Sequence, residues 1–566
     1  MSSSGWEAGR LSWESRASAL EKLGSETMDL LVVGGGIVGA GIAALAAARG
    51  LKVGLVERND LASGTSSRSS KLVHGGLRYL RMADFGLVRE ALLERSANLA
   101  LAPHLVRPQP FLYPLRHRFW ERAWVGAGVG LYDLLALGSV GRGLPRHRHL
   151  GRRRALEAAP ALRVDQVVGA VEYWDAQTDD ARLVIALART AAGLGAEVAT
   201  GTSFVGVLSS GDRIEGAILS TEEGASLEAR ARVVVLAAGP WTAEALAAAK
   251  AEGALSVVPS KGVHVVVPRD KINSSHALIF DTGRSVFLVL PWGRHWILGT
   301  TDTAWPYRPD ELVATRADLE YLLGQANQFL SSPLSDADVE SFYVGLRPLV
   351  AWRSADTAKV SREHATGRPR PGLVVISGGK LTTWRKMAED VLRTAEVDLG
   401  GLPPPRPLRI VGGEGFEEAR KDLARQARDA GCSEAEAKRL LGRYGSEWRK
   451  IASLCQARPE LARPVVPGLE LTGAEASFAF SHEGARHLDD ALDRRLGLGL
   501  ERQHVRLAAA RAVVELVAPE LGWDSARQAS ELQRYRQLAE DAERFVACPD
   551  DASARSLREA RASGRS

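Results

Sequence analysis

The sequence predicts an α/β protein with three parts: a Rossmann-like α/β domain, an antiparallel β-rich substrate or cap domain, and a C-terminal α-helical domain. Three observations support this prediction. Residues 28–57 follow the pattern strand, glycine-rich turn, helix, strand. Alternating apolar residues at 262–268 and 285–292 indicate antiparallel strands. After a Pro/Gly-rich stretch at 400–415, Ala, Leu, Arg and Glu recur at helical spacing.

The first α/β unit carries a glycine fingerprint. An apolar run at 30–33 precedes Gly34, Gly36 and Gly39, and an Ala-rich helix then leads to a second strand that ends in Glu57. In this context the glycines predict a dinucleotide site. The first allows a tight turn, the second lets the backbone approach a pyrophosphate, and the third allows helix and strand to pack closely. We expect the pyrophosphate at the helix N-terminus and a ribose at Glu57.

Three apolar strand candidates end in glycine-rich turns, at 31–36, 233–241 and 373–384. We interpret them as strands of one central parallel sheet whose carboxyl ends surround the ligand. This interpretation divides the chain into a disordered tail at 1–25, a discontinuous nucleotide-binding domain at 26–80, 160–249 and 341–400, a cap domain at 81–159 and 250–340, a linker at 401–415, a helical domain at 416–547 and a tail at 548–566.

Composition limits the classes of partner. The formal net charge is +5 and 25% of the residues are charged, which suits an anionic substrate or a membrane surface and gives no reason to expect nucleic acid. Cys432, Cys455 and Cys548 form no C-x-x-C pair, so we expect neither disulfides nor a Cys-ligated metal. The polar residues 1–25 predict no secretory signal, and the glycines within 28–48 argue against a membrane span there.

Several motifs resemble those of FAD-dependent glycerol-3-phosphate dehydrogenases, which belong to the D-amino-acid-oxidase-like flavoprotein superfamily. In chain order they are GGGIVGAGIA, TSSRSSKLVHGGLRYL, AAGPW, KGVHVVVP, GTTDT, GLRPL and GGKLTTWRKMAE. The resemblance is strong over residues 28–400 and looser through the helical domain, in LLGRYGSEW and SHEGARHLDDALDRR. The combination of HGGLRYL with GGKLTTWRK is the specific part, because the glycine fingerprint alone leaves the whole superfamily open.

The resemblance implies oxidation of sn-glycerol 3-phosphate to dihydroxyacetone phosphate by bound FAD, with electrons passed to a membrane quinone. It also implies a peripheral protein at the cytoplasmic face of the inner membrane, with a homodimer as one assembly. Two alternatives stay open from the sequence. A glycerol-3-phosphate oxidase of the same fold would reduce oxygen to hydrogen peroxide. A non-catalytic flavin-binding protein would act through its helical domain.

The resemblance assigns substrate binding to three residues. Arg78 and Tyr79, in HGGLRYL, are expected at the substrate, although the aromatic ring is equally suited to simple packing. Arg362, in KVSREHA, is the expected phosphate clamp, since Arg binds phosphate with bidentate geometry. The alternative for each Arg is a surface ion pair.

Three further residues are expected to act in catalysis. His264, in KGVHVVVP, is the expected general base because imidazole titrates near working pH. The alternative is a core histidine, since β-branched residues surround it. Arg347, in YVGLRPLV, is expected near the reactive flavin atoms, where it would bind substrate and stabilise negative charge. Lys380, in SGGKLTT, is expected beside the flavin ring.

The remaining predicted contacts are with the cofactor. The hydroxyl-rich segment 63–70 is suited to binding the diphosphate and ribityl chain, although such a composition is also ordinary for a loop. The full set of predicted cofactor residues is Gly34, Gly36, Gly39, Glu57, Thr65, Ser66, Ser70, His74, Gly75, Gly239, Gly379, Lys380, Leu381 and Thr382.

A membrane contact is predicted at residues 116–154. Basic ends flank an apolar centre that contains Trp120, Trp124 and Tyr132. Such a segment can lie in a lipid interface with its aromatic rings at the headgroups and Arg on phosphates. A buried amphipathic helix followed by a solvated basic loop fits the pattern equally well, and the need to reach a lipid-soluble quinone favours the membrane.

Overall fold

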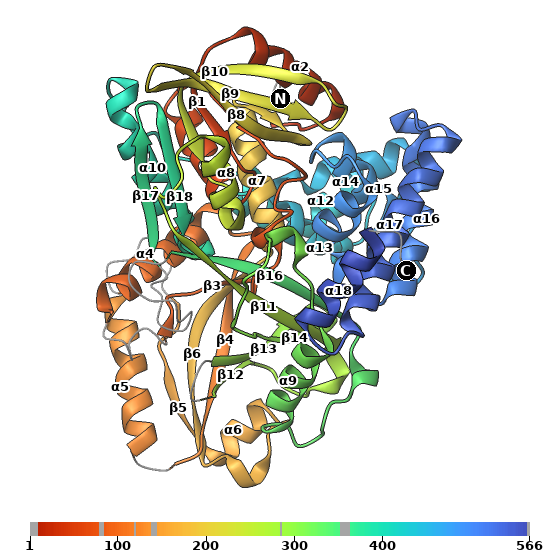
Figure 1. The fold of residues 1–566 in the computed structure, drawn as a ribbon. Helices are drawn as coiled ribbons and strands as arrows, with labels where there is room; N and C mark the ends of the chain where they lie inside the picture. Colours follow the sequence, from red (N-terminus) through yellow and green to blue (C-terminus); the bar gives the residue numbers. More distant parts are fainter. Residues whose placement is uncertain are drawn as a thin grey trace.

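The computed structural model describes residues 9–77, 84–117, 120–136, 144–282, 286–350 and 363–562. Its strands form two sheets, one above the other in Figure 1, and the C-terminal helices lie beside both of them.

The first sheet is the predicted parallel sheet. In spatial order it contains β17 (His364–Arg370), β18 (Leu373–Gly378), β10 (Ser226–Leu236), β1 (Met28–Val33), β2 (Val53–Val56) and β7 (Glu197–Ala199). Strands β18 to β7 are parallel, and β17 is antiparallel to β18. The glycine-ended segments predicted for one sheet are the adjacent strands β1, β10 and β18, so that prediction is confirmed. An antiparallel ribbon of β8 (Thr202–Ser210) and β9 (Arg213–Thr221) extends from β10.

Both faces of the first sheet are covered. Helices α3 (Ile37–Ala48), α7 (Asp180–Gly193) and α10 (Trp384–Leu399) share one apolar core with the sheet. The opposite core contains residues of α2 (Trp13–Ser25), α8 (Thr242–Ala248) and the β8–β9 ribbon. Burial on both faces explains the continuous apolar runs of β1, β2 and β10, because parallel strands between two helical layers have no polar face.

The second sheet is almost entirely antiparallel. Its order is β15 (Thr303–Ala304), β11 (Val257–Pro268), β14 (His295–Gly299), β13 (Val286–Trp292), β12 (Ala277–Asp281), β4 (Val106–Leu115), β6 (Gly169–Thr178) and β3 (Leu72–Val73), with β16 (Ser341–Val350) on β11 and β5 (Arg148–Gly151) on β6. Only the β12–β4 contact is parallel among these pairs. Helices α6 (Arg152–Ala158) and α9 (Arg316–Asn327) pack on one face, and α4 (Phe85–Leu101) and α5 (Trp120–Leu135) on the other.

The predicted boundary between the nucleotide-binding domain and the cap domain is wrong at three strands. Residues 26–80, 160–249 and 341–400 were assigned to the nucleotide-binding domain, but β3, β6 and β16 belong to the second sheet. Strand β16 pairs with β11 from Val257↔Val350 to Val266↔Ser341. The alternation of apolar residues predicts a strand but does not identify its partner, so the sequence could not assign these strands to a sheet.

The predicted disorder of both chain ends is also wrong where the structure describes them. Helix α2 lies within 1–25, begins with a capping box at Ser12, and buries Ala19 and Leu23 under the first sheet. Helix α18 (Asp551–Ala562) lies within 548–566, and Asp551 bonds the buried Lys261 at 2.5 Å. In both segments a few buried contacts fix an otherwise polar helix, which composition alone does not reveal.

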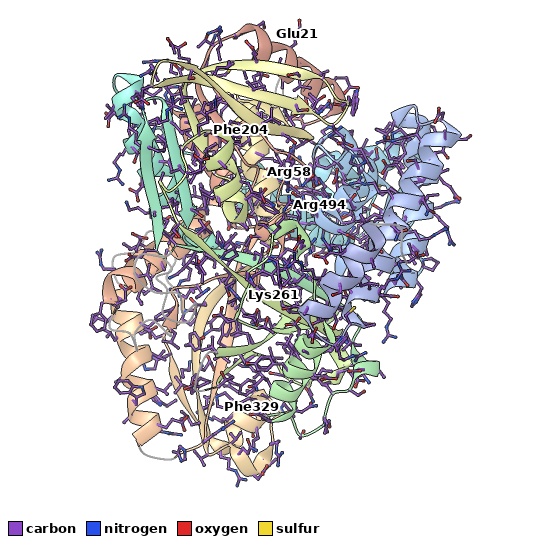
Figure 2. All side chains as sticks on the ribbon, in the orientation of Figure 1. Glu21, Arg58, Phe204, Lys261, Phe329 and Arg494 are labelled. Atoms are coloured by element: carbon purple, nitrogen blue, oxygen red, sulfur yellow. The ribbon has the colours of Figure 1, made fainter. Side chains whose placement is uncertain are left out.

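The helical domain consists of α11 (Phe416–Lys421), α12 (Leu423–Asp429), α13 (Glu434–Tyr444), α14 (Trp448–Ala457), α15 (Gly473–Ser481), η11 (Asp490–Arg495), α16 (Gln503–Leu521), α17 (Ser525–Val546) and α18. Its contacts with the rest of the chain are ionic as well as apolar. Lys261, labelled in Figure 2, lies where α18 meets the second sheet. Among the described residues no helix is long and apolar enough to span a bilayer, and no cluster of three or more His, Cys, Asp or Glu there is arranged for a metal.

Candidate active site

A cavity of about 300 Å³ lies at the carboxyl ends of β1, β10 and β18. This is the edge of a parallel sheet at which nucleotide ligands bind. The structure therefore brings together, from three distant parts of the chain, most of the residues predicted for the cofactor. Those that line the cavity are Gly34, Gly36, Glu57, Thr65, Ser66, Gly239, Gly379, Lys380 and Leu381.

The glycine turn after β1 has the geometry that the fingerprint predicts. Gly34 has φ +114°, and a Cβ there would lie 2.5 Å from the carbonyl oxygen of Ala237. A Cβ on Gly39 would lie 1.9 Å from the carbonyl oxygen of Gly34, so the helix and the turn are in direct contact. Gly36 is the N-cap of α3 and has no side chain over the helix end. The first turn of α3 lines the cavity, although Ser66 Oγ accepts from the N–H of its first residue, Ile37. This helix end suits an anion.

Glu57 ties the turn after β2 to the glycine turn. Its carboxylate accepts hydrogen bonds from the backbone N–H of Gly35 at 2.6 Å and of Asn59 at 2.9 Å. Burial raises the pKa of Glu57, and the two N–H groups oppose that rise. The carboxylate lines the cavity, where the predicted ribose contact would lie.

The hydroxyl-rich segment connects the two sheets. Thr65 donates to the carbonyl oxygen of Leu346 at 2.5 Å, and Ser66 Oγ accepts from the N–H of Ile37 at 3.0 Å. Ser70 Oγ lies 2.8 Å from Nε2 of His264. Since these contacts reach β16, α3 and β11, the segment links the glycine turn to the second sheet.

His74 and Gly75 continue the same path but do not line the cavity. The N–H of His74 donates to Thr382 Oγ1 at 3.0 Å, which joins this segment to the turn after β18. The N–H of Gly75 donates to the hydroxyl of Tyr132 at 2.7 Å. A Cβ on Gly75 would lie 2.5 Å from the end of the Leu92 side chain and 2.6 Å from the Tyr132 hydroxyl, so the segment packs closely here.

His264 and Arg347 lie on one face of the second sheet. In the β11–β16 register His264 is opposite Tyr343 and Arg347 is opposite Ser260, with Gly262 between them. A Cβ on Gly262 would lie 2.5 Å from the Arg347 guanidinium, so the missing side chain makes room for that group. The two predicted catalytic residues therefore share one surface beside the cavity.

His264 is buried, with 2% of its surface exposed. Its ring stacks on Tyr343 with 4.7 Å between centroids. Burial, together with the charges of Arg347 and Lys71, holds the pKa of His264 well below its ordinary value of 6.5. The imidazole is therefore neutral at physiological pH. In the described part of the chain its Nδ1 has no hydrogen-bond partner.

Arg347 is held by oxygen atoms of the GTTDT motif. Its guanidinium donates to Thr300 Oγ1 at 3.0 Å and to the carbonyl oxygen of Thr301 at 3.1 Å, and it lies 3.5 Å from Asp302. The next residue, Pro348, lines the cavity. A permanent positive charge is thereby fixed at the end of the cofactor cavity that faces the second sheet.

The turn after β18 completes this end of the cavity. Gly378 and Gly379 have φ +82° and +77°, and a Cβ on Gly379 would lie 2.4 Å from Met387. Lys380 is the N-cap of the short helix η8 (Leu381–Thr383) and lines the cavity. Two consecutive left-handed residues turn the chain back at this point, which places Lys380 on the cavity side.

Arg78, Tyr79 and Arg362 lie outside the described residues, so their predicted substrate contacts stay predictions.

The sequence did not predict two groups of residues that the structure places at or near the cavity. Arg58 and Trp241 line the cavity and both donate to Asp310 Oδ1, at 2.9 and 3.0 Å.

The second group that the sequence did not predict is a buried hydrogen-bond network that contacts Gly75. Asp175 accepts from Tyr132 at 2.8 Å and from Arg95 at 2.6 Å. The helical spacing of Val125, Val129 and Tyr132 is a signal that could have placed the tyrosine on a buried face.

Comparisons with known proteins agree with this architecture. The model of the DAO family, FAD dependent oxidoreductases, matches residues 29–385. The C-terminal domain of alpha-glycerophosphate oxidase matches residues 406–528. The chain belongs to the DAO family of FAD-dependent oxidoreductases. The predicted flavin cofactor and fold class are thus confirmed.

Curated relatives match this DAO-family chain over nearly its whole length. Glycerol-3-phosphate dehydrogenase 2 of Mycobacterium tuberculosis is 45% identical over 563 residues, which cover 98% of this chain and 95% of the relative. The mitochondrial glycerol-3-phosphate dehydrogenase of Homo sapiens is 35% identical and covers 92% of this chain and 74% of the relative. The solved glycerol-3-phosphate dehydrogenase of Bacillus halodurans, complexed with FAD, superposes with a TM-score of 0.77 at 28% identity, over 95% and 99% of the two chains.

The residues at the cavity fit FAD. The N-terminus of α3 suits a diphosphate, and the acid Glu57 suits a ribose. A Cβ at Gly239 would meet open space, which leaves the wall at β10 free for a large ligand. Positive charge from Arg347 and Lys380 lies at the opposite end, where a flavin that gains electrons needs it.

The lowered pKa of His264 predicts a stability change with pH. The unfolded chain takes up the proton near pH 6.5 while the folded chain does not, so stability is lost as pH falls below about 6.5, by at most about 1.4 kcal/mol per pH unit. A His264→Gln variant lacks this group and should lose less stability between about pH 7.5 and about pH 5.5. Thermal unfolding midpoints at the two pH values measure the difference.

His504→Gln, on the exposed surface of α16, is the matched control and should lose as much stability as the unmodified protein. Equal losses in the His264 variant and the unmodified protein would show that His264 takes up its proton in the folded state.

Proposed function

We propose that the protein oxidises the C2 hydroxyl of sn-glycerol 3-phosphate to the ketone of dihydroxyacetone phosphate. The observation that carries this proposal is the 45% identity, over 98% of the chain, to relatives named glycerol-3-phosphate dehydrogenases. The fixed cation Arg347 supports it, since a phosphorylated substrate requires positive charge at the reactive end of the cavity.

The reaction removes a hydride from C2 and a proton from its hydroxyl group. Bound FAD supplies the two-electron acceptor for the hydride. Arg347 holds an oxygen of the substrate and offsets the negative charge that the hydride brings to this end of the cavity. Oxygen atoms of several residues hold the guanidinium in place, namely those of Ser260, Lys261, Thr300, Thr301 and Asp302. Little reorganisation therefore accompanies the reaction.

His264 is the proposed proton acceptor. Its low pKa keeps the ring neutral, so a nitrogen lone pair is available at working pH. Nε2 contacts Ser70 Oγ in this structure, and the substrate hydroxyl would take the position of that contact. Lys380 adds a second positive charge at the cavity end. Arg78, Tyr79 and Arg362 complete the proposed substrate site.

We propose a membrane quinone as the electron acceptor. An oxidase that reduces oxygen is the second candidate, because the model that matches residues 406–528 is named for alpha-glycerophosphate oxidase. The two differ in their product, since an oxidase releases one hydrogen peroxide per substrate and a dehydrogenase reduces a quinone-like dye.

The surface that supports membrane contact is helix α5. Its inner residues Val125, Val129 and Tyr132 are buried on the second sheet, while Trp124 and Leu134 are each 60% exposed. The basic strand β5 lies against the same helix, since a Cβ on Gly126 would meet His149 at 2.5 Å. One face of α5 is thus part of the core. We propose that the exposed face contacts lipid at the cytoplasmic side of the inner membrane.

Anaerobic addition of sn-glycerol 3-phosphate should abolish the yellow absorbance of the purified holoprotein, whereas glycerol should barely change it, because Arg347 and the other cations bind the phosphate. Arg347→Ala should keep FAD, but its flavin should bleach about a hundredfold or more slowly. Stopped-flow absorbance measures both effects, and parallel peroxide and dye-reduction assays identify the acceptor.

Arg213→Ala is the matched control, because that guanidinium pairs with Asp398 at the first sheet, away from the cavity. It should bleach at the normal rate. A holoprotein that sn-glycerol 3-phosphate does not bleach would overturn the substrate assignment, and normal bleaching of Arg347→Ala would remove the role given to Arg347.

Replacing Trp124 and Leu134 together by Ser should weaken binding to anionic phospholipid vesicles by about tenfold, since two exposed apolar side chains no longer enter the interface. Turnover with a soluble dye should not change. Vesicle sedimentation measures the binding. Leu194→Ser, at an exposed leucine of the first domain, is the control, and an equal loss in that variant would contradict a role for α5.

A further inference from the structure

A buried ion cluster joins the helical domain to the loop after β2. Asp60 is 2% exposed, and its carboxylate contacts two consecutive arginines of η11. Arg494 Nε donates to Asp60 Oδ2 at 2.5 Å, and Arg495 Nη2 donates to Oδ1 at 2.8 Å. Figure 2 labels Arg494 where the helical domain meets the first sheet, close to Arg58 of the same loop. The cluster therefore bridges the two domains at the cofactor cavity.

The loop that Asp60 holds is one wall of that cavity. Glu57, Arg58, Asn59 and Ser63 line it, whereas Asp60 does not. The loop also makes two hydrogen bonds with Gly35 of the glycine turn, one to its N–H group and one to its carbonyl oxygen. Glu57 accepts from the N–H of Gly35 at 2.6 Å, and the N–H of Ala62 donates to the carbonyl oxygen of Gly35 at 3.0 Å. A shift of this loop would therefore move the diphosphate site as well as the ribose site.

The loop contains a residue in an unfavourable backbone conformation, which contacts from other parts of the chain must stabilise. Ala62 has φ +62°, a left-handed conformation that is unfavourable for a residue with a Cβ. The N–H of Ser63 donates to the carbonyl oxygen of Asp60 at 3.0 Å, so the same turn begins at Asp60. Anchoring the Asp60 side chain fixes the start of this strained turn.

The arginines are themselves fixed within the helical domain. Arg495 is fully buried and donates through Nε and Nη2 to the carbonyl oxygen of Glu483, at 3.2 and 2.7 Å. Arg494 pairs with Asp489 at 2.8 Å and also with Asp490. Because other residues of the helical domain fix both arginines, the arginines can hold the Asp60 carboxylate in one position.

We propose that Asp60, Arg494 and Arg495 are positioning residues for FAD. Through them the helical domain holds loop 57–63 in the conformation that binds the ADP half of the cofactor. This gives the helical domain a part in cofactor retention. The inference rests on the family's FAD site and is independent of the proposed substrate.

Asp60→Asn keeps the shape of the side chain but removes the charge between two buried guanidinium groups. The buried Arg495 then loses its carboxylate partner, whereas Arg494 keeps Asp489 and Asp490. The weakened anchor of the loop should increase the Kd for FAD by about tenfold or more. Flavin fluorescence during titration of the apoprotein with FAD measures this Kd without any substrate. Arg495→Lys, which keeps the charge but loses the bidentate contact, should raise the Kd by a smaller factor.

Glu447→Gln is the matched control. It breaks another buried ion pair between the two domains, Arg189–Glu447 at 2.6 Å, which does not touch loop 57–63. Its Kd for FAD should stay within about twofold of the unmodified value. An unchanged Kd in Asp60→Asn, or an equal rise in Glu447→Gln, would overturn the proposal. If Asp60→Asn does not fold, an unchanged Kd in Arg495→Lys overturns it.

Discussion

The close contact between Gly39 and the carbonyl oxygen of Gly34 sets the geometry of the cofactor site. It allows α3 to begin directly above the end of β1, so the first turn of the helix faces the space where β1, β10 and β18 end. With any side chain at position 39 the helix would move away from the turn. Glu57, Ser66 and Ala62 all bond the turn or the first residues of α3, so their positions follow from the same contact.

The second sheet supplies what the first cannot, a fixed cation and a neutral imidazole at the far end of the cavity. The β11–β16 pairing places Arg347 and His264 on one face, and glycine at 262 leaves room for the guanidinium. Segment 65–75 links this face to the glycine turn through Thr65, Ser66 and Ser70. In the proposed reaction, the cofactor is thus bound at the first sheet and the substrate at the second, and one short segment links the two.

The sequence predicts the local parts of this arrangement and not the long-range ones. The glycine turn, the three parallel strands and the helical domain follow from patterns within a few dozen residues. The sheet to which β6 and β16 belong, and the anchoring of α2 and α18, depend on partners far along the chain. Asp60 and Arg494 are 434 residues apart, so no spacing rule could join them. His264 and Arg347 were found through resemblance, while their shared face follows only from strand register.

The FAD content of a Gly39→Ala variant shows whether the cofactor site depends on the close approach of α3 to the glycine turn. The new methyl group would lie 1.9 Å from the carbonyl oxygen of Gly34, so the account predicts a protein with native far-UV circular dichroism that is purified with little or no flavin. Gly86→Ala, where a Cβ meets open space, should keep one FAD per chain. A Gly39→Ala protein that binds FAD stoichiometrically and with unchanged affinity would contradict the account.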